Sequence, residues 1–213
     1  MIEGLYAAAS GLIAIENRQA VISNNIANAS TPGFKRQTPV ERGFYQVYLQ
    51  HAGSPVLLDA ERAPGGGVKL DETFSDYSLG VVSDTGNPLD LALVGPGFIT
   101  VQTPSGERLT RNGKLNMGAD GALVTQEGYQ VLGVDGGPID VRGGNVAVQP
   151  DGRVTVDGQG AGQIRMLEFS DLHMLERAGH SLYYAPQAAM EKAVPAENTT
   201  IAAESLERSN VQL

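Results

Sequence analysis

The stretch "ISNNIANASTPGFKR", residues 22–36, decides how the chain begins to fold, because one regular pattern ends within it. It closes an alanine-rich segment of helical periodicity with a proline and a glycine, which do not continue a helix. Three asparagines precede that stop, and asparagine side chains bond readily to nearby backbone groups. The stretch therefore predicts a junction at which the chain turns out of a helix. The junction residues are Asn24, Asn25, Asn28, Pro32 and Gly33.

The preceding segment, residues 1–29, follows a heptad pattern. Six of its seven successive a and d positions are apolar, and the exception is Gln19. We call the apolar positions the seam; they are Leu5, Ala8, Leu12, Ile15, Ile22 and Ile26. The opposite positions are polar: Glu3, Ser10, Asn17 and Asn24. Further apolar rows beside the seam predict a helix with more than one neighbour, and a buried helix of a single globular domain is the alternative.

Beyond the junction, residues 36–67 lose the helical period and end in a Gly- and Pro-rich run, which predicts an extended connector with a few short strands. Residues 68–186 then show short apolar and β-branched runs between turn signals, as in antiparallel β-structure. Asp-Gly pairs begin at Asp120, Asp135, Asp151 and Asp157, and this dipeptide favours tight hairpin turns. The expected core residues are Leu91, Leu93, Phe98, Val101 and Leu132.

The last segment, residues 187–213, predicts a return path with a short helix from Thr200 to Arg208. The expected domain limits are therefore 1–35 for the helix and its junction, 36–67 for the connector, 68–186 for the β-domain and 187–213 for the return segment. The fold class is α+β, with an N-terminal assembly helix and a mainly antiparallel all-β outer domain, either a sandwich or an irregular barrel.

Composition excludes several classes of function. The chain has 213 residues, a formal net charge of −9 and no cysteine, which argues against a nucleic-acid partner and against thiolate metal sites. No apolar run is long enough to cross a membrane, and no secretory signal with a cleavage site opens the chain. The three histidines lack ligand spacing, and no nucleophile or nucleotide motif is complete. We expect no catalytic, cofactor-binding or metal site.

Three stretches, in this order, resemble the bacterial flagellar rod and hook family. They are "SNNIANASTPGFKR" at residues 23–36, "TGNPLDLALVGPGFITVQTPSGERLTRNGKLNMGADGALVTQEGYQVLG" at residues 85–133 and "ESLERSNV" at residues 204–211. Turns around Gly136, Pro150 and Gly162 are more similar to those of FlgF-type proximal rod subunits than to those of FlgG-type distal ones. Family members continue after the third stretch into a helix that pairs with the N-terminal one, whereas this sequence stops at Leu213.

The resemblance implies a structural subunit of the flagellar rod that polymerises through its terminal helices and β-domain to build the drive shaft. Its implied partners are copies of itself, other rod subunits and the flagellar type III export apparatus, with no membrane insertion. The implied location is the basal body in the periplasmic space. Phe44 and Tyr48 are similar to the aromatic pair of the family's export motif. The alternative is a secreted β-rich binding or adhesive module, although sugar-binding surfaces usually present exposed tryptophan or tyrosine and this chain has no tryptophan.

Overall fold

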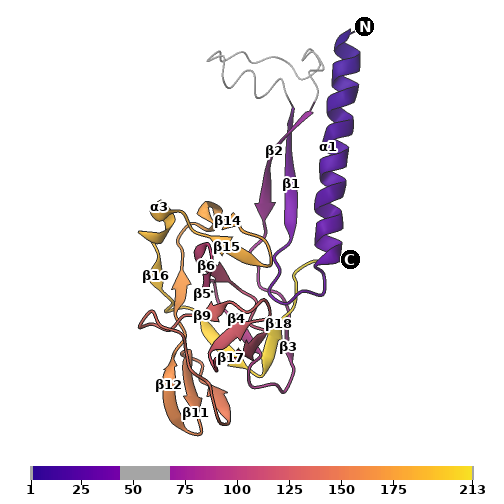
Figure 1. Cartoon of the computed structure of the whole chain (residues 1–213). Helices are drawn as coiled ribbons and strands as arrows, with labels where there is room; N and C mark the ends of the chain where they lie inside the picture. The colour runs from indigo at the N-terminus through magenta and orange to yellow at the C-terminus, as the bar shows by residue number, and fades with distance from the viewer. Residues whose placement is uncertain (1, 44–67, 213) are drawn as a thin grey trace. The chain divides into compact units, whose positions relative to one another are not determined.

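The computed structural model describes residues 2–43 and 68–212 (Figure 1). The described chain divides into two compact units: Met1–Ala27 with Arg36–Asp76, which we call the helix unit, and Asn28–Lys35 with Tyr77–Leu213, which we call the β unit. These limits differ from the expected ones, because residues 28–35 belong with the β unit and residues 36–43 and 68–76 belong with the helix. Fold class α+β is confirmed, and the described strands pair antiparallel without closing into a barrel.

The helix unit consists of one helix and a two-stranded ribbon. Helix α1 spans Ile2–Ala27, as the heptad pattern predicts, and strands β1, Gln37–Gly43, and β2, Val68–Ser75, pair antiparallel. The register of the ribbon shifts between Val40 and Glu41. The helix lies along both strands (Figure 1). The expected connector therefore contributes a strand that packs on the helix.

The β unit contains short strands and two short helical segments. Its elements are β3 Val82–Asp84, β4 Leu91–Val94, β5 Phe98–Thr103, β6 Gly106–Thr110, β7 Leu115–Met117, β8 Leu123–Thr125, β9 Gln130–Val131, β10 Val146–Val148, β11 Arg153–Val156, β12 Gln159–Gln163, β13 Met166–Glu168, η2 Leu172–Met174, β14 Glu176–Arg177, β15 Leu182–Tyr184, α3 Gln187–Met190, β16 Val194–Pro195, β17 Thr200–Ala203 and β18 Ser205–Glu207.

The largest sheet of the β unit has nine strands, and β5 is its hub. Its main path runs β14-β15-β6-β5-β9-β8-β7, while β13 pairs with both β5 and β16. Successive side chains of a strand point to opposite faces, so β5 contributes to two cores. Ile99 and Val101 join one hydrophobic cluster, and Phe98 joins a second with Leu109 and Tyr183. Burial on both faces agrees with a strand that is buried at every position except Gln102.

The predicted core residues of the β unit are confirmed. Leu91, Leu93, Phe98, Val101 and Leu132 are each at most 4% exposed. Phe98, however, packs in the second cluster, whereas Leu91, Leu93 and Val101 pack in the first, because Phe98 points to the other face of β5. Ring contacts with Tyr77, Phe169 and Tyr183 hold it there, at centroid separations of 5.4 to 6.1 Å.

The Asp-Gly pairs also form turns as predicted. Gly121, Gly136, Gly152 and Gly158 all have φ between +81° and +84°, a region that favours glycine. At the hairpin between β11 and β12, Asp157 has a φ of +50° as well, which gives the positive pair of angles typical of a two-residue turn between twisted strands. This hairpin and β10 together form the three-stranded sheet β10-β11-β12.

The helix predicted from Thr200 to Arg208 is wrong. The segment forms β17, which pairs with β4, and β18, which pairs with β3. Glu204 lies between the two strands with a φ of +55°, so the extended conformation is interrupted there. Alanine and glutamate favour a helix locally, but burial of Ile201 and pairing with strands β4 and β3 outweigh that preference. The return segment thus completes the β unit.

Candidate functional site

The seam of α1 is an exposed apolar surface. Leu5, Leu12, Ile15, Ile22 and Ile26 are between 46% and 71% exposed, and Ala8 is exposed too. Single exposed apolar residues are common, whereas a contiguous exposed apolar row is a frequent feature of interaction surfaces. Ile13, 59% exposed, extends the row on one side.

The opposite side of α1 faces the ribbon rather than solvent. Among the side chains of α1 whose burial is described, Ala14 and Asn25 are buried, about three turns apart, and Ser10 and Asn17 on the same side are half-buried. The Asn25 amide donates to the Gln37 carbonyl at 2.7 Å, and its carbonyl oxygen accepts from the Gln37 amide at 2.9 Å. Asn25 therefore links α1 to β1 through one donated and one accepted hydrogen bond with the backbone of Gln37, as a residue of a paired strand would.

The other junction residues lie in different surroundings. Asn24 is exposed on the helix, and the Asn28 side chain accepts a hydrogen bond from the Thr31 hydroxyl at 3.2 Å. The Thr31 amide also donates to the Asn28 carbonyl, which closes a turn over residues 29 and 30. The Phe34 amide donates to the Thr31 carbonyl, which closes a second turn around Pro32 and Gly33. Asn25 and Asn28 thus form hydrogen bonds within the chain, the first to Gln37 of β1 and the second to Thr31.

Gly33 marks the point at which the junction enters the β unit. It is buried with a φ of +65°, and its amide donates to the Glu207 carbonyl at 2.8 Å. A Cβ atom on Gly33 would lie 2.3 Å from the Arg111 carbonyl oxygen. Only glycine fits both the backbone angle and the space.

Lys35, Arg111 and Glu207 form a buried charge cluster, and each side chain is 1% exposed. The Lys35 Nζ donates to Glu207 Oε1 at 2.6 Å, and the Arg111 Nε and Nη2 donate to Glu207 Oε2 at 3.2 Å. Sequence reasoning did not predict this cluster, although each member lies in one of the three stretches that carry the family resemblance.

Further hydrogen bonds satisfy the cluster. Glu207 Oε1 also accepts from the Gly80 amide, and Lys35 donates to the Ser78 carbonyl at 2.6 Å. Arg111 donates to the carbonyls of Gly97 and Leu93. Because removing one partner of a buried ion pair typically costs about 3–5 kcal/mol, the cluster fixes residue 35 beside residue 207.

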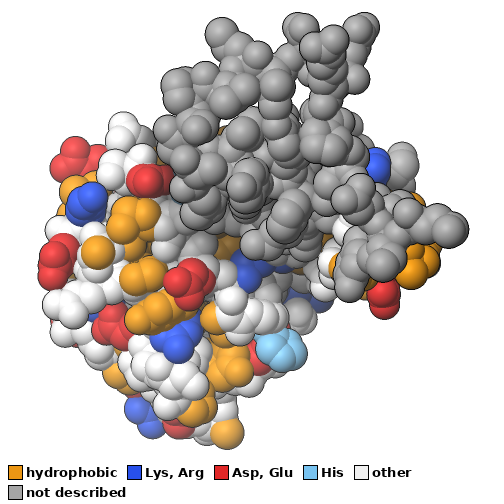
Figure 2. Space-filling model, turned by 90° about the horizontal axis from the view of Figure 1, so that it is seen from above, with side chains coloured by type: hydrophobic (Ala, Val, Ile, Leu, Met, Phe, Trp, Pro, Cys, Tyr) orange, Lys and Arg blue, Asp and Glu red, His pale blue; other side chains and the backbone are white. Residues whose placement is uncertain are grey.

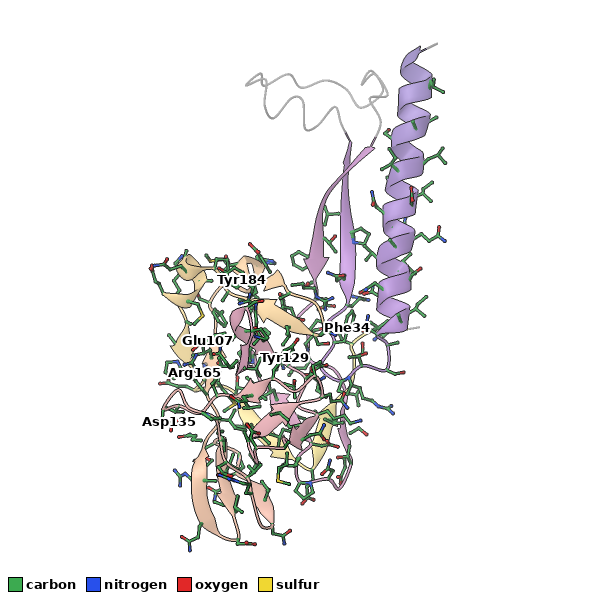
Figure 3. The ribbon with its side chains drawn as sticks, viewed as in Figure 1. Phe34, Glu107, Tyr129, Asp135, Arg165 and Tyr184 are labelled. Atoms are coloured by element: carbon green, nitrogen blue, oxygen red, sulfur yellow. The ribbon has the colours of Figure 1, made fainter. Side chains whose placement is uncertain are left out.

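Phe34, labelled in Figure 3, is buried in the β unit next to Lys35 in the chain. It is 3% exposed, the Arg177 guanidinium lies 4.5 Å from its ring centroid, and Arg177 donates to the Lys35 carbonyl at 2.8 Å. The Asn210 amide donates to the Phe34 carbonyl. We call residues Gly33, Phe34, Lys35, Arg111 and Glu207 the clasp, because they hold the start and the end of the chain together in the β unit.

The described residues offer little that is typical of a catalytic centre. Residues 2–43 and 68–212 contain no group of three or more His, Asp or Glu side chains placed to hold a metal ion. No helix in that part of the chain is long and apolar enough to span a bilayer. Figure 2 shows hydrophobic, basic and acidic side chains interspersed on the visible described surface, without a basic patch. Phe44 and Tyr48, the pair similar to an export motif, lie outside the described residues.

The helix α1 exposes an apolar face, and the clasp holds residues 33–35 beside residue 207 in the β unit. These are features of the class of subunits that assemble with other chains. Two family models match the chain: "Flagella basal body rod protein" over residues 5–35 and "Flagellar hook protein FlgE/F/G D1 domain" over residues 92–156.

Relatives match over most of their length. The flagellar basal-body rod protein FlgG of Caulobacter vibrioides is 35% identical over 92% of this chain and 79% of its own. FlgF proteins of the same organism and of Mesorhizobium japonicum are 34% and 32% identical, over 100% and 99% of this chain and 84% and 83% of theirs. The chain belongs to the family of bacterial flagellar basal-body rod proteins. FlgF and FlgG relatives match at similar identity, so they do not separate the two subunit types.

Proposed function

We propose that the chain is a structural, non-catalytic subunit of the flagellar basal-body rod that assembles with copies of itself and with other rod subunits through the seam of α1. The observation that carries the proposal is the exposed apolar row from Leu5 to Ile26 on a helix whose other side already packs on the ribbon. An uncovered row of this kind gains most when a neighbouring subunit buries it.

The clasp supports the same role. It fixes residues 33–35 beside residue 207, so the segment that follows α1 enters the β unit next to β18. We further propose that the subunit reaches the periplasmic part of the basal body by type III export, with Phe44 and Tyr48 as the export motif, and that it is of the FlgF type. Family membership supports the rod over a secreted β-rich binding module.

The test is a charge placed on the seam in a motile host. Leu12→Asp and Ile22→Asp should abolish swimming and lower the yield of basal bodies, because a buried unpaired carboxylate is repeated in every subunit. Arg18→Asp is the matched control, since Arg18 is exposed on α1 outside the seam. Normal swimming by Leu12→Asp would contradict the proposal.

A second measurement reads the contact directly. The chain has no cysteine, so a single cysteine introduced at Leu12 or Ile22 reports only on its own neighbourhood. We expect cross-links from Leu12→Cys to an adjacent subunit in purified basal bodies. Their absence, in a variant that swims, would show that the seam is not a subunit contact.

A further inference from the structure

The clasp connects segments that are 172 residues apart in the chain, and it does so through charges that water does not reach. Glu207 is the anion for two buried cations, Lys35 and Arg111. Without Glu207, both cations would lose the carboxylate that they pair with inside the β unit, and loss of a buried counter-charge is strongly unfavourable.

The dependence runs in the other direction as well. Glu207 is itself buried, and its Oε1 is satisfied by Lys35 and by the Gly80 amide. The backbone bonds follow the same path: the Gly33 amide donates to the Glu207 carbonyl, and the Asn210 amide donates to the Phe34 carbonyl. Each segment therefore supplies groups that the other needs in order to be buried.

We propose that the clasp is an interlock, in which residues 28–35 dock on the β unit only when β18 is in place, and β18 stays in place only when residues 28–35 are docked. The two segments are then ordered together or released together. Such reciprocity is the thermodynamic signature of coupled sites.

On the proposed export route, the interlock affects a chain whose N-terminal segment emerges first. Lys35 and Arg111 would emerge long before Glu207, the carboxylate that they pair with in the β unit. Docking of the junction would accordingly wait for the end of the chain, so that a partly emerged subunit could not adopt the finished arrangement at its N-terminal segment.

The test is hydrogen exchange of the purified full chain, with a change in one segment and a readout in the other. Glu207→Gln should accelerate exchange of the Gly33 and Phe34 amides about a hundredfold, as expected for breaking a buried ion pair. Gly33→Ala should accelerate exchange of the Gly80 and Arg208 amides in turn, because Gly80 donates to Glu207 and Arg208 to Val81.

Two further variants make the result decisive. Asp140→Asn removes a carboxylate from an exposed ion pair with Arg142 and should leave the Gly33 amide unchanged. Asn210→Ala removes the side-chain bonds to Ser78 at an accessible position, and the interlock predicts a rise of about fivefold at Gly33 and Phe34. This milder variant gives the answer if Glu207→Gln unfolds the whole β unit, which fast exchange in β11 would reveal.

Exchange that accelerates only in the mutated segment, in both Gly33→Ala and Asn210→Ala, would overturn the interlock. This outcome is distinct from failure of the proposed function, because the measurement uses the isolated chain and reads neither assembly nor swimming.

Discussion

At the scale of single residues, the interior of the β unit contains two kinds of side chain that respond differently to substitution. Leu93 is fully buried in the larger hydrophobic cluster, where its contribution comes from packing and from removal of apolar surface from water. Glu207 is buried to the same degree, but its contribution depends on its two cationic partners.

Leu93→Ala should lower the free energy of unfolding of the β unit by about 2–5 kcal/mol, because it removes buried methyl groups and leaves a cavity. The measurement is the midpoint of denaturant or thermal unfolding. Val134→Ala is the control, since Val134 is 62% exposed and should change stability little. An unchanged midpoint for Leu93→Ala would contradict the assigned packing.

Tyr183 gives a prediction about alkaline pH. Burial raises the pKa of its hydroxyl above the usual value, while the nearby Arg177 acts in the opposite direction. The folded protein therefore keeps a proton that the unfolded chain loses above a pH of about 10. The contribution of neutral Tyr183 to stability is complete below that pH and is lost as pH rises through the raised pKa.

Tyr183→Phe should accordingly make the free energy of unfolding fall less steeply between neutral pH and about pH 11. The measurement is a series of denaturant titrations at increasing pH. Tyr184→Phe serves for comparison, because Tyr184 is 39% exposed. Identical alkaline slopes for the wild type and Tyr183→Phe would refute the prediction.

Sequence reasoning reached the apolar core residues but not the charge cluster. Leu91 and Leu93 follow from an apolar run between turn signals, which is a local pattern. Lys35, Arg111 and Glu207 are distant in the chain, and charged residues are normally exposed. Their burial depends on pairing that only the folded β unit creates, so the one available signal was their position inside the three family-like stretches.

At the scale of elements, the hairpin between β11 and β12 depends on backbone angles. Gly158→Ala should destabilise the β unit by about 1 kcal/mol or more, because alanine is strained at a φ of +81°. Gly160→Ala is a matched control: neither position has a neighbouring atom within 4 Å of the added Cβ, and Gly160 has no such φ. Equal unfolding midpoints for the two variants would show that the turn geometry contributes nothing.

Helix α1, the main strands and the Asp-Gly turns were predictable because their signals are local. The segment Thr200–Arg208 was not, since its alanines and glutamates favour a helix while its partners, β4 and β3, lie more than a hundred residues earlier. The ribbon side of α1 was missed for a related reason. Ser10 and Asn17 form a polar row typical of a solvated face, yet the ribbon half-buries them.

At the scale of the whole molecule, the two units should differ in protection. Because the seam is uncovered in the isolated chain, α1 is stabilised from the ribbon side alone, and a lone helix of this length is marginal. We expect a monomer or weak associate in which amides of α1 exchange faster than those of β5. Uniform protection from Leu5 onward, or a stable oligomer in sedimentation, would contradict this expectation.

The α+β class and the order of helix, strands and return segment were predictable from the sequence, whereas the division into units was not. Residues 28–35 follow α1 directly in the chain but belong with the β unit, and β2 begins the expected β-domain but pairs with β1. Periodicity and turn residues locate elements along the chain. They do not show which elements share a core, because that depends on long-range pairing.

The clasp also determines how the molecule carries mechanical load. A pull applied through residue 27 reaches Gly33 and Lys35 first, where the backbone bond to Glu207 and the ion pair beside it resist the force. From Glu207 the load can pass directly into residues 208–212 without extending the strands from β4 to β15. Under such a pull we expect the hydrogen bonds and the ion pair between residues 33–35 and Glu207 to bear tension before the sheets of the β unit do.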